Sequence, residues 1–225
     1  MTDRLKFLMR VHALNYSARV LFNTPEIDET GYDINIEHRF SYLPLQLKTK
    51  GTHAKTSSWK IQAGLFQPKL AMQNEFDLKV HGHLCGLEGG GGGVLLQVFD
   101  DTAPFSEGME INYYYSDYFY VFAVFKGYWK VQGFSAQQAE KILVKIMNLD
   151  VNEKFNLPMA AFFPIKSPAS VLELLLHIGQ MSNYVSVHNH MRGSSVPALL
   201  LRPFWKSISA QIPLEFSSQF PNYIP

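Results

Sequence analysis

Residues that could hydrolyse a phosphodiester bond lie in two neighbouring runs of the sequence. Asp33 belongs to the run GYDINIE, and Gln46 and Lys48 belong to the run PLQLKTKG. A carboxylate suits a hard divalent cation such as magnesium, while a nearby ammonium group can position a water molecule and stabilise a pentacovalent phosphate. The residue types therefore permit metal-dependent phosphodiester cleavage. The solvated face of an ordinary sheet is the alternative, because polar residues are usual there.

The two runs predict an antiparallel hairpin that positions these side chains. Isoleucine alternates with Asp, Asn and Glu over residues 33–37, and leucine alternates with Pro, Gln and Lys over residues 43–48. Side chains of a strand alternate between its two faces, and only a few residues separate the runs. We therefore expect the isoleucines and leucines to face the core. Asp33 then shares the other face with Asn35 and Glu37.

The register of the hairpin decides whether the polar side chains meet. With a turn centred near residue 40, Asp33 is expected opposite Leu47. Gln46 and Lys48 then lie diagonally beside Asp33, where the three side chains are within reach of a shared ion or water molecule. The hairpin therefore predicts one polar cluster from two strands.

Four stretches of the sequence resemble a known family. DETGYDINIE at 28–37 carries the pattern D-x-x-G-x-D, and PLQLKTKG at 44–51 carries Q-x-K. GYWKVQG at 127–133 has a Tyr-Trp pair that closes on glycine, and FFPIKSPASVLELLLHIGQM occupies 162–181. In these motifs the chain resembles the PD-(D/E)xK nuclease superfamily, in the variant with glutamine at the third position. More narrowly, it looks like a prokaryotic domain family of unknown function with this nuclease-like fold.

The resemblance implies a fold and a division of the chain. The implied fold is α/β and restriction-endonuclease-like, with a mixed central sheet flanked by helices. Residues 1–181 would form this nuclease-like domain, in which Gly31 would allow the tight start of the first hairpin strand. Residues 182–225 lie outside the resemblance. We expect this Pro-rich C-terminal extension to pack on the domain or on a partner protein.

The resemblance also implies roles for individual residues. Asp33 would bind the metal, Lys48 would act on the attacking water, and Gln46 would orient water or the ion in place of the usual second carboxylate. Asp28 and Glu26 are further candidate metal ligands. The implied cofactor is Mg²⁺ or Mn²⁺.

This candidate site is poor in negative charge. The family pattern often places a glutamate on the first helix, where this chain has only Asp3, and glutamine occupies the third position of the motif. The first hypothesis is a metal-dependent nuclease, for which the resemblance implies a bacterial defence or effector role. The second is a catalytically weak or inactive nuclease-fold module that binds nucleic acid or a partner protein.

The distribution of charge bears on the partner. The formal net charge is only +1, so it gives no global argument for nucleic acid. Between Glu37 and Glu75, however, the sequence has six basic residues and no acidic one. Such a stretch can follow a phosphate backbone, although lysines scattered over a solvated surface are the alternative. The residues expected to contact nucleic acid, with DNA favoured over RNA, are Arg39, Lys50, Lys55 and Lys60.

Composition and cysteine usage exclude several classes of protein. Hydrophobic residues make up 47% of the chain, which is enough to build a core. Cys85 is the single cysteine, so an intrachain disulfide is excluded and a reducing compartment is expected. No signal peptide is apparent, and no run of about 18 apolar residues predicts a membrane helix. We expect a cytoplasmic protein without a membrane partner, acting as a monomer or as a homo-oligomer.

The remaining elements follow from periodicity and capping residues. Five consecutive glycines precede an apolar run, which predicts a turn and a buried strand, since a phosphate-binding loop needs a following lysine. The histidine pairs His81–His83 and His188–His190 are expected to be ordinary surface or loop residues. The other predicted elements are a helix over 3–14, strands near 17–22, 59–65 and 94–99, two aromatic strands over 110–133 with a break near Ser116–Asp117, a helix from Ser135, a strand over 159–165 and a helix from Ser167 to about Met181.

Overall fold

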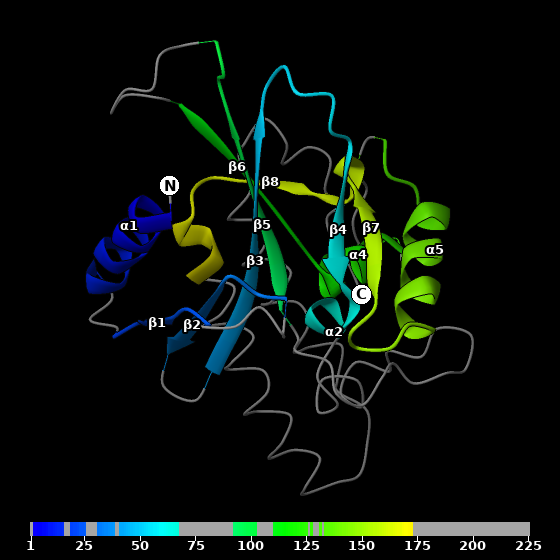
Figure 1. Ribbon diagram of the computed structural model, residues 1–225, viewed down its shortest axis with the longest axis horizontal. Coiled ribbons are helices and arrows are strands. Elements are labelled where there is room, and N and C mark those ends of the chain that lie inside the picture. The colour runs from blue at the N-terminus through cyan, green and yellow to red at the C-terminus, as the bar shows by residue number, and fades with distance from the viewer. Residues whose placement is uncertain are drawn as a thin grey trace, which may run out of the picture.

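The computed structural model, shown in Figure 1, includes the predicted hairpin and the elements around it. The described residues are 2–15, 19–25, 31–38, 41–67, 92–102, 110–125, 127, 131 and 133–172. The predictions for the following residues lie outside these ranges: Glu26, Asp28, Arg39, His81, His83, Cys85, His188, His190 and the extension 182–225.

A six-stranded mixed sheet forms the centre of the fold. Its strand order is β1-β2-β3-β5-β6-β8, in which β3 and β5 are parallel and the other neighbours are antiparallel. A second, two-stranded antiparallel sheet pairs β4 with β7. The predicted α/β class with a mixed central sheet is therefore confirmed. The strands are β1 Leu21–Asn23, β2 Ile34–His38, β3 Ser41–Gly51, β4 Ser58–Gln62, β5 Gly93–Phe99, β6 Ile111–Asp117, β7 Lys154–Pro158 and β8 Phe163–Ile165.

The helices among the described residues are short. They are α1 Thr2–Asn15, α2 Ala63–Phe66, α4 Tyr118–Phe125 and α5 Ala136–Met147, with a 3-10 turn at Met159–Ala161. Within the ranges that the structure covers, no helix is both long and apolar enough to cross a membrane.

β2 and β3 form the predicted antiparallel hairpin. Ile34 pairs with Leu45, Ile36 pairs with Leu43, and all four side chains are buried. Because directly opposite residues of an antiparallel pair share a face, this apolar set points to the core as predicted. The polar residues between them lie on the other face.

α1 covers the apolar face of this hairpin (Figure 1). Leu5 and Met9, one helical turn apart, are buried. The guanidinium carbon of Arg10 lies 5.4 Å from the ring centroid of Phe22, a cation–π distance. Phe22 is paired with Ile36, whose side chain is in the core. α1 therefore packs on the side away from Asp33 and leaves the polar face of the hairpin uncovered by this helix.

α4 stands where the aromatic composition predicts a second strand, and that prediction is wrong. β6 ends at Asp117, at the predicted break, and Tyr118–Phe125 is helical. The Asp117 carboxylate accepts the Tyr120 N–H at 2.9 Å and so caps the first turn. The octapeptide is apolar on every side, so neither a strand period nor a helix period is visible in it. Burial against α5 outweighs the β propensity of its aromatic residues.

α5 begins at the predicted cap. The Ser135 hydroxyl accepts the Gln138 N–H, and the Gln138 side chain accepts the Ser135 N–H at 2.8 Å, which together form a capping box. β7, which follows α5, was not predicted. It pairs with β4, and Trp59 opposite Leu157 is part of the buried centre of that small sheet.

The predicted strands on either side of these elements are confirmed in part. β5 follows the glycine tract and is buried, as predicted. Only Phe163–Ile165 of the predicted strand over 159–165 is a strand, because a 3-10 turn occupies its first residues. Residues 169–172 are helical after Ser167, whose carbonyl accepts the Ser170 N–H at 3.1 Å.

Candidate functional site

Gln46 and Lys48 lie on the polar face of the hairpin, and Asp33 lies at its start, in a hairpin register one residue from the predicted one. Asp33 directly precedes β2, and Gln46 and Lys48 are alternate residues of β3. The hairpin pairs Ile34 with Leu45, so its turn is centred slightly earlier than residue 40. The regular pairing ends there, because the Asp33 N–H donates to the Leu45 carbonyl and the Asp33 carboxylate accepts the Leu47 N–H. Asp33 is therefore held beside Leu47, the residue expected opposite it, and Gln46 and Lys48 are the neighbours of Leu47 in β3.

Two hydrogen bonds hold Asp33 against β3 on either side of Gln46. The Asp33 N–H donates to the Leu45 carbonyl at 2.8 Å, and the Asp33 Oδ2 accepts the Leu47 N–H at 2.5 Å. The carboxylate thus takes the place of a main-chain acceptor at the start of the ladder. A carboxylate has about four lone-pair positions, so this contact leaves acceptor capacity for another group.

Gly31 allows the tight backbone turn just before Asp33 and β2, as the sequence analysis expected. Its φ is +72°, and a Cβ placed there would lie 2.1 Å from Oε1 of Gln62. Any other residue would meet both the strained backbone region and the Gln62 side chain. The close approach brings the end of β4 against the segment that carries Asp33.

Two amide oxygens on the polar face are buried without a hydrogen-bond donor in the described part of the chain. They are Oε1 of Gln46 and Oδ1 of Asn35. Asn35 and Asp33 are alternate residues and share a face, and Asn35 is opposite Pro44 of β3, two residues from Gln46. A buried acceptor without a donor costs on the order of 1–3 kcal/mol, so such groups usually have a partner. Sequence alternation placed Asn35 on this face but gave no reason to choose it.

The orientation of the Asn35 amide follows from its neighbours. Its Nδ2 donates to Oε1 of Glu37 at 3.0 Å, and Nδ2 of Asn23 donates to the same oxygen at 2.7 Å. The nitrogen of Asn35 is therefore turned to Glu37, and its oxygen is turned away from it. Glu37 is engaged by the two asparagines, which makes Asn35, rather than Glu37, the available group beside Asp33.

These residues fit a hard divalent cation. One carboxylate and two amide carbonyl oxygens are ligands that Mg²⁺ and Mn²⁺ accept, with water completing the coordination. An ion on this face would also provide the missing partner for the two buried oxygens. Asp28 and Glu26, the other candidate ligands, lie outside the described residues, and so they stay predictions.

The basic residues expected to contact nucleic acid are only partly brought together. Lys50 follows Lys48 on the same face of β3. Lys55 is exposed in the segment after β3, and Lys60 is exposed on β4, in the other sheet. The structure therefore supports a short row of two lysines on β3 rather than one continuous basic surface.

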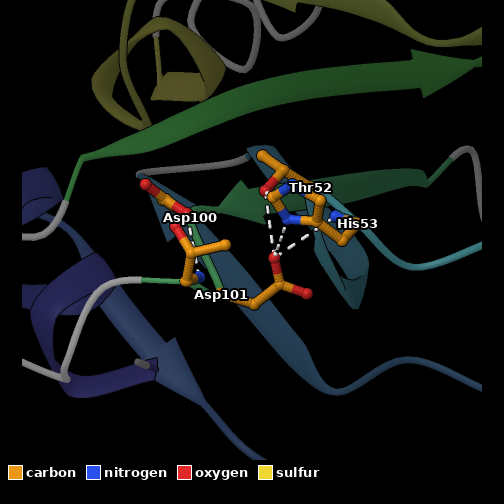
Figure 2. Close-up of polar contacts among 5 residues, drawn as sticks. Thr52, His53, Asp100 and Asp101 are labelled. Carbon is orange, nitrogen blue, oxygen red and sulfur yellow. Dashed lines mark hydrogen bonds and ion pairs between the residues drawn. The ribbon is translucent and has the colours of Figure 1, made fainter.

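A second polar cluster lies at the far end of β3 and was missed by the sequence analysis. His53 follows β3, Asp100 and Asp101 follow β5, and one ligand atom from each residue lies within 4.8 Å of the others (Figure 2). The signal was the Asp-Asp pair directly after an apolar strand. The Asp-Asp pair can be recognised as part of a cluster only because β3 pairs in parallel with β5 and brings His53 beside it, and the sequence does not show this pairing.

Hydrogen bonds account for the charge state of this second cluster. The hydrogen bond from the His53 side chain is the main reason that the pKa of Asp101 is lowered to about 2. The His53 N–H and the Thr52 hydroxyl, which also donate to this carboxylate, lower the pKa further. The hydroxyl and N–H of Thr102 lower the pKa of Asp100. Both carboxylates are therefore ionised at neutral pH.

Comparison with protein-family models, with curated proteins and with solved structures finds no match to this chain. The structure is a mixed α/β fold with a six-stranded mixed sheet and a separate two-stranded sheet.

Proposed function

We propose that this chain is a metal-dependent nuclease-like protein of the PD-(D/E)xK type, which hydrolyses phosphodiester bonds of nucleic acid. The observation that carries the proposal is the hairpin face itself. Asp33 is bonded to Leu45 and Leu47 on either side of Gln46, and Lys48 is the next residue of β3 on the face of Gln46. The buried amide oxygens of Asn35 and Gln46 have no donor among the described residues.

Each residue of this face has a role that follows from its position. The Asp33 carboxylate and the Gln46 carbonyl oxygen would hold Mg²⁺ or Mn²⁺, and Asn35 would add a third oxygen. The bound ion would supply Lewis-acid polarisation of a phosphoryl oxygen and a more acidic water. Leu47 holds the Asp33 carboxylate in place through its N–H.

Lys48 and Lys50 supply positive charge along the same strand face. The Lys48 ammonium group, two residues after Gln46 on β3, would position the attacking water and stabilise the charge that develops on the phosphate. Lys50, one step further along β3, binds a neighbouring phosphate of the backbone, and exposed Lys55 extends this contact. Arg39 and Lys60 are assigned a weaker backbone contact.

The fold is consistent with a restriction-endonuclease-like arrangement. A mixed sheet carries the hairpin at one side, and α1 covers its apolar face (Figure 1). α2 contacts β3, and Asp33 and Lys50 lie toward the two ends of the polar face. We assign residues 1–181 to this domain and residues 182–225 to contact with the domain or with a protein partner. By the same proposal the protein acts in the cytoplasm, as a bacterial defence or effector module.

One observation favours a second function, an inactive module that binds nucleic acid or a partner protein. Among the described residues, the acidic groups on this face are Asp33 and Glu37. The Asp33 carboxylate already accepts the Leu47 N–H, and Glu37 is engaged by Asn23 and Asn35. Salt-sensitive binding of nucleic acid without cleavage would identify this second function.

A cleavage assay tests the first function. Plasmid DNA, labelled single-stranded DNA and labelled RNA are incubated with the full chain in Mg²⁺, Mn²⁺ or EDTA. We expect metal-dependent cutting that is lost in Lys48→Ala and retained in Lys141→Ala, which removes an exposed lysine of α5. Cutting that persists in both Asp33→Ala and Lys48→Ala would overturn the assignment.

A further inference from the structure

The His53–Asp100–Asp101 cluster is separate from the hairpin face. It lies beyond the carboxyl ends of β3 and β5, the parallel pair of the sheet, and the Thr52 N–H extends their ladder to the Phe99 carbonyl at 2.9 Å. Ligands of open α/β sheets are commonly bound outside the carboxyl ends of parallel strands. His53 is seven positions after Gln46, which is roughly 20 Å along a strand.

The donor atoms of the cluster are already spaced as ligands of one ion. His53 Nδ1 and Asp101 Oδ1 are 2.8 Å apart, and a carboxylate oxygen of Asp100 lies within 4.8 Å of both. Two ligands of tetrahedral zinc, each at about 2.1 Å, are about 3.4 Å apart. An ion would therefore replace the proton that Nδ1 and Oδ1 now share and move the two atoms roughly half an ångström apart.

The surrounding groups hold the two carboxylates in this arrangement. The Thr52 hydroxyl and the His53 N–H donate to Asp101 Oδ1 at 3.0 and 3.2 Å (Figure 2). The Thr102 N–H and hydroxyl donate to Asp100 Oδ1 at 2.9 and 2.6 Å. Hydrogen bonds to ligating carboxylates of this kind orient them and are characteristic of metal sites.

Gly51 gives Asp101 its place over the strand end. A Cβ at Gly51 would lie 2.1 Å from Asp101 Oδ2, so the carboxylate occupies space that any other residue would fill. This close approach does not depend on the hydrogen bonds of the cluster. It indicates that the chain is shaped to keep Asp101 beside His53.

The choice of donors distinguishes the class of ion. One imidazole nitrogen with two carboxylates is the ligand type of zinc and of other divalent first-row transition ions, whereas Mg²⁺ and Ca²⁺ prefer oxygen alone. Three protein ligands leave coordination positions for water, and the His53 side chain is 68% exposed, so the cluster is accessible. We propose that His53, Asp100 and Asp101 form a second metal site, which binds a divalent first-row transition ion such as Zn²⁺.

Calorimetric titration of the EDTA-stripped full chain with Zn²⁺ tests the proposal, with Co²⁺ absorption as a spectroscopic signature of the ligands. We expect a Zn²⁺ site whose affinity falls about tenfold or more in His53→Ala and in Asp101→Asn. The His81→Gln/His83→Gln double variant, which removes another histidine pair, should bind as the unmodified chain does. Circular dichroism of each variant confirms that it is folded.

The outcomes are distinguishable from those of the cleavage assay, because Zn²⁺ binding is read without substrate. Asp33→Asn should leave the Zn²⁺ titration unchanged even where it abolishes cutting. Equal Zn²⁺ affinity with and without His53, or loss of binding in the His81→Gln/His83→Gln variant alone, would overturn the proposal and leave an adventitious ion only. Full competition by Mg²⁺ at similar concentration would overturn it as well.

Discussion

The two polar regions of β3 differ in how their acceptor atoms are satisfied. In the middle of the strand, Gln46 and its neighbour Asn35 bury carbonyl oxygens that find no donor in the described structure. At the end of the strand, Asp101 receives hydrogen bonds from Thr52 and His53. In the described structure the first region therefore has acceptors to spare, whereas the acceptors of the second are already hydrogen-bonded. An ion that binds the folded chain at either region would raise the free energy of unfolding according to its affinity and concentration.

The largest difference between the two polar regions of β3 is expected in the rate of nucleic-acid cleavage. Asp33→Asn removes charge from the proposed metal ligand and should lower kcat at least about 100-fold, as loss of transition-state electrostatics commonly does. His53→Ala should leave kcat within about twofold, because it lies at the other end of β3. Single-turnover cleavage in Mg²⁺ measures both variants. Similar losses in the two would erase the distinction between the regions.

The next effect concerns the glycine that positions Asp33. Gly31→Ala should lower the free energy of unfolding by about 2–4 kcal/mol, since it combines a positive φ with a clash against Gln62. Gly127→Ala is the matched control, because its φ is +74° and, among the residues that the structure describes, none apart from its chain neighbours comes within 4 Å of the added Cβ. Urea denaturation measures the loss in the free energy of unfolding for both variants. The difference between the two losses is the cost of the clash with Gln62. Equal costs would show that the Gln62 contact does not constrain the Asp33 segment.

A smaller effect of opposite sign is expected at Gln46. Gln46→Leu removes a buried oxygen without a donor, so the free energy of unfolding of the metal-free protein should stay unchanged or rise by up to about 1 kcal/mol. Gln67→Leu is the contrast, because the Gln67 Oε1 is likewise buried without a donor in the described residues while its nitrogen is hydrogen-bonded. The Gln67 Nε2 donates to the carbonyls of Ile146 and Leu149 at 2.9 and 3.0 Å, so this variant should lose stability. A clear loss in Gln46→Leu would mean that its amide is satisfied and that the region needs no ion.

The smallest effect is a pH dependence at the end of β3. Hydrogen bonding to His53 lowers the pKa of Asp101 from an ordinary 3.8 to about 2. A lowered carboxylate pKa stabilises the fold above the ordinary value, and this contribution is lost as pH falls from about 4 to 2. In EDTA, the stability difference between the unmodified chain and Asp101→Asn should shrink over that interval. A constant difference would show that the His53 contact does not form in solution.

The hairpin was predictable because its signal is local. Alternation alone gave the faces of β2 and β3, and the serine cap with Gln138 marked the start of α5. The one-residue register difference at Asp33 could not be read from the sequence, since the turn centre was known only approximately. It left Asp33 beside β3, where its carboxylate accepts the Leu47 N–H between Gln46 and Lys48.

Other features depend on contacts between distant segments. Tyr118–Phe125 shows no periodicity, so its helix is decided by the Asp117 cap and by packing against α5. The pairing of β4 with β7 joins segments far apart in the chain, and its residues give no local sign of it. His53 and Asp101 likewise become neighbours only through the parallel pairing of β3 and β5.

The most direct test of the account is to count Mn²⁺ bound to the hairpin face by electron paramagnetic resonance. The titration uses His53→Ala, which removes the second site, and compares it with the double variant His53→Ala/Asp33→Asn. We predict one bound Mn²⁺ per chain that Mg²⁺ displaces, and its loss when Asp33 is replaced. Equal Mn²⁺ binding with and without the Asp33 carboxylate would contradict the assignment of this face as a metal site.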